Sequence, residues 1–528
     1  MLNKNLFTLL SCLLLTGCGM IDYHPYDVRI SGETDVNAHN IEQIETDCKG
    51  KKTIRFVTMG DSQRWYDETE DFVKAINKRN DIDFVIHGGD MSDFGVTKEF
   101  LWQRDIMNGL SVPYVTLIGN HDCLGTGAET YKAIFGPTNF SFIAGDVKFV
   151  CLNTNALEYD YSEPVPDFTF MENELTNRTD EFNKTVISMH ARPYTDVFND
   201  NVVKMFQHYV KQYPGIQFCT AAHTHHYRDD VIFDDGIHYV TSDSMDKRTY
   251  LVFTITPEKY EYELVNIKYI GRAGLIIILL FFTCPSSATC KTDTVINTYK
   301  RDSLYFAVKA DSIIAFHTGD SLCTIIKADT VLPVIPKAVK RTGYDNRVHR
   351  FRKNWERIIP THAKIQYAGN MGLLSFGTGW DYGKRNQWET DILLGFIPKY
   401  SSKKTKVTMT LKQNYMPWSI NIGKGFSTEP LACGLYLNTV FGDQFWVNEP
   451  DRYPKGYYGF SSKVRIHIYM GQRLTYDIDP QRRFLAKSVT FFYEISTCDL
   501  YLVSAVQNSY LRPRDYLSLS FGLKFQWL

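Results

Sequence analysis

Apolar and polar positions alternate differently in the two halves of this chain. In the first half, short apolar runs typical of β-strands are separated by helix-like stretches such as residues 68–77 and 202–213. This alternation predicts a layered α/β domain, which we place at residues 51–268. The strand-like runs are residues 54–59, 84–86, 114–118, 186–189 and 218–221.

The second half has a different pattern. From residue 361 onward, strand-like segments rich in aromatic residues and glycine follow one another, separated by turn-forming residues. Segments of about ten residues with alternating hydrophobicity and aromatic ends are typical of outer-membrane β-barrels. Residues 517–528 also resemble the C-terminal sorting strand of such barrels. We therefore predict an all-β domain over residues 361–528, an antiparallel barrel of about eight strands, with a soluble β-sandwich as the alternative.

A short apolar segment lies between the two halves, at residues 269–290. Lys268 and Arg272 precede its apolar core, residues 273–282, and small residues follow this core. The core is too short for a typical transmembrane helix and resembles a second secretory signal inside the chain. This favours a fusion of two reading frames that were once exported separately, with a buried helix or a membrane anchor as alternatives. Residues 291–360 contain a short repeat and a basic stretch, and we expect them to form a linker.

The beginning of the chain has the pattern of a targeting signal. Lys4 precedes an apolar stretch that ends in Leu15-Thr16-Gly17-Cys18, which resembles the lipobox of bacterial lipoproteins. The resemblance implies a signal peptide at residues 1–18 and a lipid on Cys18, whereas a plain secretory signal or a short buried helix are the alternatives. Residues 19–50 are polar and are predicted to be a tether. We expect the protein in the cell envelope of a Gram-negative bacterium, lipid-anchored in the outer membrane or periplasm.

Composition narrows the choice of partners. With 528 residues the chain is long enough for two or three domains, and a net charge of −1 gives no reason to expect nucleic acid. The 11 cysteines include no Cys-x-x-Cys pair, so neither a zinc ribbon nor a thioredoxin-type motif is predicted. We expect the membrane to be a partner through the N-terminal lipid and the C-terminal barrel.

Polar clusters follow the strand-like runs of the first half. Because strand ends meet at one edge of a sheet, we expect these side chains to converge on a site. Carboxylates, an asparagine and histidines together make a mixed oxygen and nitrogen ligand set suited to two transition metals. The clusters are Gly60-Asp61-Ser62-Gln63, Gly88-Gly89-Asp90-Met91-Ser92-Asp93, Gly119-Asn120-His121-Asp122, Met189-His190 and Ala222-His223-Thr224-His225.

The order of these clusters resembles the order of motifs in the calcineurin-like metallophosphoesterases, and the resemblance covers about residues 52–268. That family has D-x-H, G-D-x-x-D, G-N-H-[DE], a single His and G-H-x-H in this order. The chain departs from the pattern at Gln63, where the family has His, and at Ala222, where it has Gly. The resemblance implies a layered β-sandwich flanked by helices, and hydrolysis of phosphate monoesters or diesters by a metal-activated water.

The resemblance also implies metal ligands. Asp90 would bridge two divalent or trivalent ions, which the ligand types suggest are Mn, Fe or Zn. Asp61 and His225 would hold the first ion, with Gln63 in the position of a further ligand. The second ion would be held by Asn120, His190 and His223.

Two residues are candidates for the catalytic step itself. By resemblance, His121 would be the acid that protonates the leaving oxygen, and Asp122 would orient it. Gln63 leaves a second hypothesis open, because a carboxamide oxygen is a weaker ligand than imidazole. In that hypothesis the chain is a membrane barrel with a degenerate, binding-only phosphoesterase domain.

Overall fold

The computed structural model describes residues 20–267, 317–318, 321–322 and 342–527. Met1–Arg272 and Ile359–Leu528 form one compact unit, and Ala273–Ile358 form a second. The described part of the second unit holds the paired strands β12 (His317–Thr318) and β13 (Ser321–Leu322) and the helix α8 (Gly343–Glu356). The predicted lipid site at Cys18 and the apolar segment 269–290 lie outside the described residues. No helix among the described residues is long and apolar enough to cross a membrane.

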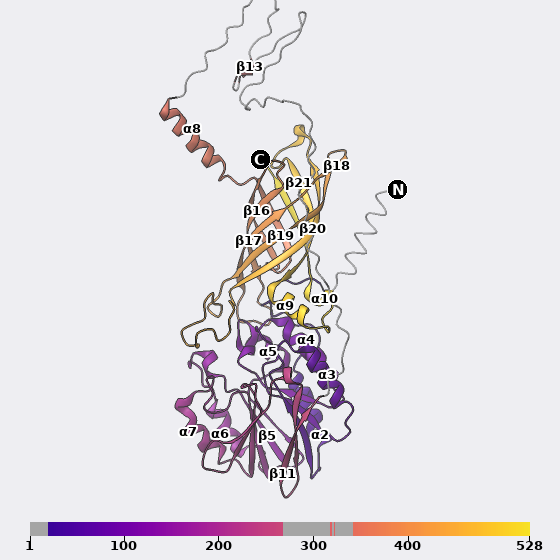
Figure 1. Cartoon of the computed structure of the whole chain (residues 1–528), viewed down its shortest axis with the longest axis vertical. Coiled ribbons are helices and arrows are strands. Elements are labelled where there is room, and N and C mark those ends of the chain that lie inside the picture. Colours follow the sequence, from indigo (N-terminus) through magenta and orange to yellow (C-terminus); the bar gives the residue numbers. More distant parts are fainter. Residues whose placement is uncertain (1–19, 268–316, 319–320, 323–341, 528) are drawn as a thin grey trace, which may run out of the picture. The chain divides into compact units, whose positions relative to one another are not determined.

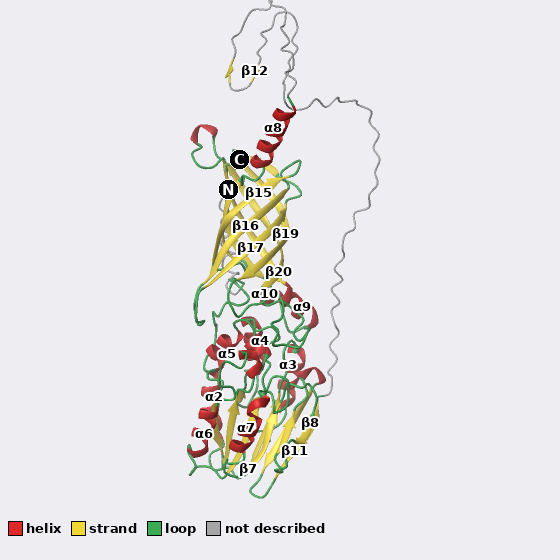
Figure 2. Cartoon of the chain, turned by 90° about the vertical axis from the view of Figure 1, so that its left-hand side faces the viewer, coloured by secondary structure: helices red, strands yellow, loops and turns green. Residues whose placement is uncertain are grey.

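The first half is a sandwich of two mixed β-sheets (Figures 1 and 2). Phe56, Phe84 and Phe253 of one sheet pack on Phe149 and Phe218 of the other in a fully buried aromatic core. This confirms the predicted layered α/β fold. The first sheet has the order β11 (Tyr260–Asn266), β10 (Thr249–Ile255), β1 (Ile54–Met59), β2 (Phe84–His87) and β3 (Tyr114–Thr116). The second has the order β4 (Phe140–Ala144), β5 (Val147–Leu152), β6 (Lys184–Met189), β7 (Ile216–Ala221), β9 (His238–Thr241) and β8 (Arg228–Val231).

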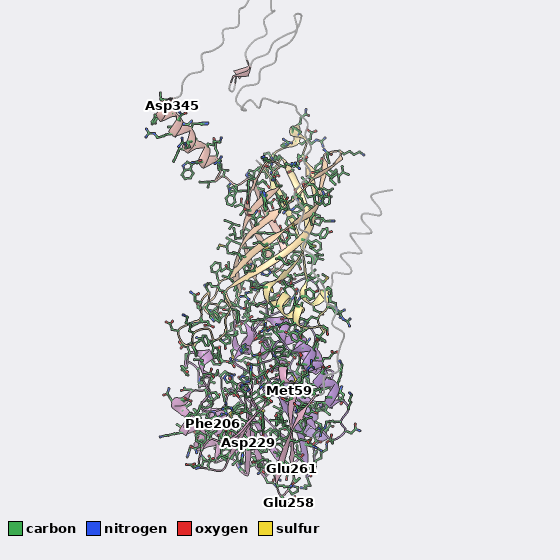
Figure 3. All side chains as sticks on the ribbon, viewed as in Figure 1. Met59, Phe206, Asp229, Glu258, Glu261 and Asp345 are labelled. Carbon is green, nitrogen blue, oxygen red and sulfur yellow. The ribbon has the colours of Figure 1, made fainter. Side chains whose placement is uncertain are left out.

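Helices cover the outer faces of both sheets. Helices α3 (Tyr66–Ile76), α4 (Thr97–Met107) and α5 (Gly127–Phe135) contribute apolar side chains to the core over the first sheet. Helices α6 (Phe168–Thr176) and α7 (Val203–Val210) do the same over the second. Figure 3 shows Met59 at the carboxyl end of β1 on the side toward the barrel, and Glu258 at the opposite end of the sheets.

The segment predicted to be a polar tether is instead structured from residue 20 onward. It forms helix α2 (Val36–Asp47), whose Val36 and Ile44 are fully buried. Before the helix, the Thr97 N–H donates to the Pro25 carbonyl over 3.1 Å, and the Gly372 N–H donates to the Tyr23 carbonyl over 2.8 Å. The few apolar residues of this segment therefore anchor it between the first domain and the C-terminal strands.

The C-terminal region is a closed antiparallel barrel, as predicted, and the β-sandwich alternative was wrong. Its eight strands pair in sequence, including β17 with β19, and closure comes from pairing of the first strand, β14, with the last, β22, from His362 opposite Gln526 to Ala368 opposite Ser520. A short strand, β18 (Ile420–Gly423), adds to the edge of β19. The eight strands are β14 (His362–Ala368), β15 (Leu374–Tyr382), β16 (Trp388–Ile397), β17 (Lys406–Tyr415), β19 (Phe426–Val440), β20 (Val464–Asp477), β21 (Ser488–Cys498) and β22 (Ser518–Gln526).

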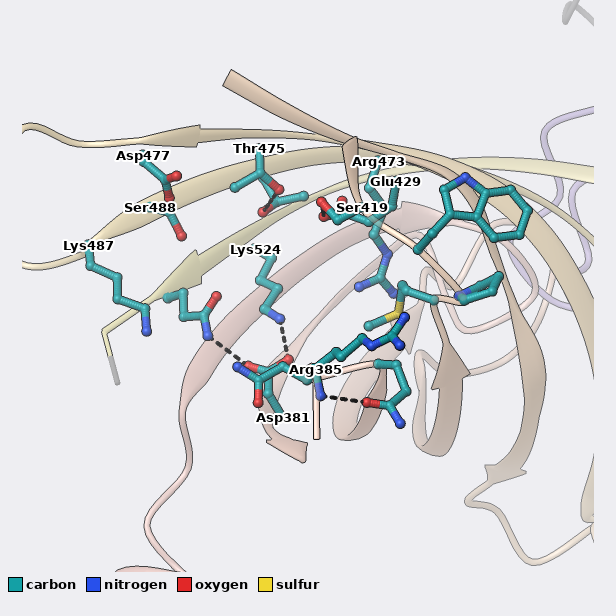
Figure 4. Close-up of a pocket in the computed structure, with 17 residues that line it drawn as sticks. Asp381, Arg385, Ser419, Glu429, Arg473, Thr475, Asp477, Lys487, Ser488 and Lys524 are labelled. Atoms are coloured by element: carbon teal, nitrogen blue, oxygen red, sulfur yellow. Dashed lines mark hydrogen bonds and ion pairs between the residues drawn. The ribbon is translucent and has the colours of Figure 1, made fainter. Parts of the chain in front are cut away.

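The barrel is polar inside and apolar outside. Charged side chains from different strands pair across the interior: Arg473 with Glu389 at 3.0 Å, and Lys524 with Asp381 at 2.6 Å. The side chains of His362, Asp381 and Glu389 converge within 4.8 Å, but the Lys524 ammonium already pairs with both carboxylates. A cavity of about 440 Å³, lined by Arg385, Lys487 and other polar residues, lies beside this network (Figure 4). Large apolar side chains exposed on the outer surface are Ile365, Phe376, Ile392, Leu394, Val407, Met409, Leu411, Leu435, Ile466, Ile468 and Met470.

One end of the barrel packs on the first domain. The connection that holds α9 (Asp499–Gln507) and α10 (Pro513–Tyr516) supplies Leu500, Tyr501 and Leu511 to the core over the first sheet. Asn508 accepts the Tyr66 N–H at the start of α3 over 3.0 Å. The two halves of the chain therefore share one hydrophobic core.

Candidate metal centre

The polar clusters converge at one edge of the sandwich. Asp61 follows β1, Asp90 follows β2, His190 follows β6, and His223 and His225 follow β7. The backbone has positive φ at Asp61 (49°), Asp90 (58°), His223 (73°) and His225 (57°). Such φ values are costly outside glycine and tend to persist where a site requires them. Asn120 reaches the same edge after β3 (Tyr114–Thr116).

One group of ligand atoms comes from Asp61, Asp90 and His225. These atoms lie within 4.8 Å of one another, and His225 Nε2 is 3.3 Å from Asp61 Oδ1. Asp61 is fully buried, and its Oδ1 accepts no hydrogen bond from the described residues. A buried carboxylate oxygen without a hydrogen-bond donor is costly, and a cation at this position would satisfy it. The donor set therefore fits a metal ion.

A second group surrounds the side-chain oxygen of Asn120. His190 Nε2 and His223 Nδ1 each lie 3.0 Å from Asn120 Oδ1. Asp90 Oδ2 is 3.4 Å from His190 Nε2, so Asp90 contributes to both groups. Burial lowers the pKa of His190, but the Asp90 carboxylate outweighs it and raises this pKa to about 9. Amide oxygen and imidazole nitrogen around a shared carboxylate fit a second ion.

Neighbouring residues fix the ligands. Asp196 Oδ1 lies 2.7 Å from His223 Nε2, which directs the other ring nitrogen toward Asn120. The Gly88 carbonyl lies 2.9 Å from His190 Nδ1 and does the same for that ring. Gly119 passes so close to Asp90 that a Cβ there would lie 2.0 Å from Asp90 Oδ1.

The His121 ring has a different partner from the one expected. His121 Nδ1 lies 2.8 Å from the Asp93 carbonyl and 3.4 Å from Asp93 Oδ1. Burial lowers the pKa of His121, but Asp90 and then Asp93 outweigh it and raise this pKa to about 10. A protonated imidazole beside the ligands is suited to donate a proton.

Asp122 stabilises the surrounding loops instead of orienting His121. Its carboxylate accepts the N–H groups of Gly119 and Asp90, each over 2.9 Å, and that of Ser92 over 2.8 Å. The reason is local: residues 121–123 form a 3-10 turn, in which adjacent side chains diverge. The sequence prediction for Asp122 is corrected accordingly, and Asp93 takes its place beside His121.

The two departures from the family pattern have local consequences. The Ala222 methyl faces Gly60 and Gly88, where added Cβ atoms would each lie 3.0 Å from it, so glycine neighbours leave room for it. Gln63 donates its N–H to the Asp90 carbonyl over 2.9 Å, and its carbonyl accepts from Gln103 Nε2 over 3.0 Å. Gln63 thus holds the loop through its backbone, and its role as a ligand stays a prediction.

A cavity of about 470 Å³ opens over the ligands. Sequence reasoning missed two residues that line it, Asp196 and Tyr457. It also missed Tyr458, whose hydroxyl accepts a hydrogen bond from Asn120 Nδ2 over 3.0 Å. Both tyrosines come from the connection between β19 and β20, far from the polar clusters, and no spacing in the first half indicates them. The cavity is lined by Asp90, Asn120, His121, Asp196, His223, Thr224, His225, His226 and Tyr457.

Comparison with known proteins gives a family match. Residues 54–227 match the family model of the calcineurin-like phosphoesterases. No curated protein matches the chain. Similar solved structures include GAP50, the anchor in the inner membrane complex of Plasmodium, at 13% identity and a TM-score of 0.32, covering 41% of this chain and 86% of that chain.

Two phosphoesterases are also among the similar structures. Purple acid phosphatase PPD1 from yellow lupin (Lupinus luteus) seeds has 16% identity and a TM-score of 0.33 over 41% of this chain and about half (52%) of its own. The calcineurin-like phosphoesterase YfkN from Bacillus subtilis has 12% identity and a TM-score of 0.28 over 41% of this chain and 91% of its own. All three TM-scores are below 0.5.

Proposed function

With residues 54–227 identified as a calcineurin-like phosphoesterase domain, we propose that the chain hydrolyses phosphate monoesters or diesters with two bound metal ions. The observation that carries this proposal is the convergence of six candidate ligand side chains, of which Asp90 belongs to both groups, with a buried Asp61 oxygen that accepts no hydrogen bond from the described residues. The metals would be Mn, Fe or Zn, in divalent or trivalent form. The six are Asp61, Asp90, Asn120, His190, His223 and His225.

Each part of the site has a task in this reaction. When bound, the two ions would supply a water of lowered pKa and positive charge for the phosphoryl oxygens. His121, whose pKa the Asp90 and Asp93 carboxylates raise, would donate a proton to the leaving oxygen. Asp93 holds the His121 ring, and Asp196 holds His223, so both rings are fixed before substrate binds.

The test is turnover by the full-length protein with each metal. Wild type should hydrolyse p-nitrophenyl phosphate or its bis-ester only when Mn, Fe or Zn is present. Asp90→Asn and His223→Ala should abolish turnover while the circular dichroism spectrum stays unchanged. His238→Ala is a matched control, because His238 pairs with Asp229 at 2.7 Å and does not line the cavity. Full activity in either ligand variant would refute the proposal.

Gln63 favours a second candidate, a domain that binds phosphate esters without hydrolysing them. Gln63 stands where the family has His, and its backbone contacts show a role in the loop that needs no metal. In this case the metal-loaded protein would bind the product phosphate but release none from any ester. Calorimetric titration with phosphate alongside the turnover assay separates the two candidates.

We also propose that the barrel lies in an outer membrane. Its apolar exterior and charged interior support this, because that pattern is the reverse of a soluble barrel. Exposed aromatic side chains gather at the barrel end remote from the first domain, as in the aromatic girdles of membrane barrels. These residues are Tyr382, Trp388, Trp418, Phe426, Tyr476 and Trp527.

The lengths of the connections support an orientation. The longest ones, residues 441–463 and 499–517, are at the end that packs on the first domain, and residues 383–387 form a tight turn at the other end. In outer-membrane barrels the longer connections face the outside of the cell. The phosphoesterase domain would therefore be displayed on the cell surface. The Leu519 N–H donates to the Met20 carbonyl over 2.6 Å, so a lipid on Cys18 would begin two residues from the barrel.

This orientation supports the hypothesis of two exported reading frames. Strand β11 ends at Asn266 in the first domain, whereas β14 begins at His362, at the barrel end remote from that domain. In a membrane these two points lie on opposite sides. An uncleaved chain would have to cross the membrane between these two points. Cleavage after the signal-like segment 269–290 would remove this requirement, and the shared hydrophobic core would keep the two products together.

A further inference from the structure

The connection between β19 and β20, residues 441–463, reaches from the barrel to the candidate metal centre; we name it the tyrosine loop. Tyr458 lies against the site: its hydroxyl accepts from Asn120 Nδ2 and donates to Glu158 Oε1 over 2.7 Å. Its ring meets the His121 ring edge to face, with centroids 5.0 Å apart. A residue of the barrel thus contacts both a predicted ligand and the predicted proton donor.

The tyrosine loop is held in this position from both sides. Tyr453 donates its hydroxyl to Glu158 Oε2 over 2.7 Å and packs in a small buried cluster with Leu157, Ala191 and Val197. Glu449, within the loop, accepts the N–H of Gly456 over 2.8 Å and that of Gly459 over 3.0 Å. These contacts fix the two residues between the glycines, Tyr457 and Tyr458.

Tyr457 forms the wall of the cavity. Its ring lines the cavity together with the ligands and with Asp196, the partner of His223. The Glu449 contacts on either side of Tyr457 place its ring beside the position where a phosphoryl group would meet the metals. The ring is half-buried, so one part of it stays available for contact.

The charges around the cavity restrict what can lie against this ring. Among the described residues, those that line the cavity include carboxylates and imidazoles but neither lysine nor arginine. A second phosphate group on the substrate would find neither lysine nor arginine there and would be repelled by Asp196. A neutral, planar organic group would instead stack on the tyrosine ring.

Building on the proposed function, we infer that Tyr457 is a specificity-determining residue contributed by the barrel. The substrates it selects are phosphate esters whose organic group is an uncharged planar ring, as in aryl esters or nucleoside esters with one phosphate. Polyphosphates and esters of small polyols are disfavoured. The barrel thereby takes part in substrate recognition by the phosphoesterase domain, and the tyrosine loop is the link.

The test measures binding and turnover separately in the full-length, Mn-loaded protein. Calorimetry with phenylphosphonate and methylphosphonate, which are not hydrolysed, reports the contribution of the ring. Wild type should bind phenylphosphonate about ten times more tightly than methylphosphonate, a ratio that matches the strength of one aromatic contact. Tyr457→Ala should remove this preference, and Tyr457→Phe should keep most of it. Tyr344→Ala, on exposed helix α8, is the control that should change nothing.

Turnover then distinguishes this inference from the proposed function. The ratio of kcat/KM for phenyl phosphate to that for glycerol phosphate should fall about ten-fold in Tyr457→Ala, mainly through KM. If neither wild type nor any variant hydrolyses these esters, but the Tyr457-dependent preference for phenylphosphonate persists, the inference stands and the hydrolytic proposal fails. Equal affinities of wild type and Tyr457→Ala for phenylphosphonate, or equal losses for both phosphonates, would overturn the inference.

Discussion

Replacing Tyr458 with phenylalanine tests whether the barrel supports the metal centre. The change removes one oxygen atom, which accepts from Asn120 Nδ2 over 3.0 Å and donates to Glu158 over 2.7 Å. Asn120 then loses the partner that fixes its carboxamide, while its Oδ1 must still face His190 and His223. Loss of a partner that orients a metal ligand typically costs about 10- to 100-fold in metal affinity. This corresponds to about 1.4–2.7 kcal/mol.

The assay is a competitive Mn titration of the full-length protein with a chromogenic chelator, followed by kcat/KM at saturating metal. Tyr453→Phe is the matched control, because Tyr453 also donates to Glu158, over 2.7 Å, but contacts no predicted ligand. Burial raises the pKa of Glu158 to about 7, whereas the hydrogen bonds from Tyr458 and Tyr453 lower it. Each variant removes one of these two bonds, so both disturb the carboxylate alike. Metal affinity of Tyr458→Phe within two-fold of Tyr453→Phe would refute the reasoning.

Three further predictions follow from the site and the barrel. Asp93→Asn should lower the pKa of His121, which is raised to about 10, and so move the alkaline limb of the kcat–pH profile to lower pH by roughly 1–3 units. The control Arg64→Gln removes the 2.5 Å ion pair of Asp93 and should not move this limb to lower pH. An unmoved limb in Asp93→Asn would contradict the role of His121. Metal affinity should fall as the pH drops below about 9, because the proton held by His190 competes with the ion, and a titration that releases no protons at pH 7 would contradict this. Intact cells should hydrolyse an impermeant aryl phosphate, and mass spectrometry of the native protein should find two products; activity only after lysis would place the domain inside.

The fold could be predicted from the sequence because its periodicities are strong. The runs at residues 54–59 and 186–189 became β1 and β6 almost unchanged, and the alternation from residue 361 onward became a closed barrel. The structured segment before residue 50 could not be predicted, because only isolated side chains such as Tyr26 and Val36 anchor it. These side chains contact residues that are distant in the sequence, and a local pattern of apolar and polar residues does not indicate such contacts.

The site was predictable where residues stand at strand ends and unpredictable where another element reaches in. Asp61, Asp90 and His190 converge because their strands are neighbours within a sheet or across the sandwich. Asp93, and not Asp122, lies beside His121 because of the direction of side chains in one 3-10 turn, and the spacing of residues in the sequence does not specify this direction. Tyr457 lies in the other half of the chain, and no pattern in the sequence indicates that this half contributes to the cavity.

Turnover of the full-length protein during a metal titration shows whether the site is a two-metal phosphoesterase. Metal-free protein is supplied with increasing Mn, and release of p-nitrophenol from p-nitrophenyl phosphate and from its bis-ester is followed. We predict no activity without metal and a rate that rises to a plateau at two equivalents, with no such rise in Asp90→Asn. A folded protein that takes up two equivalents and hydrolyses neither ester would contradict this prediction.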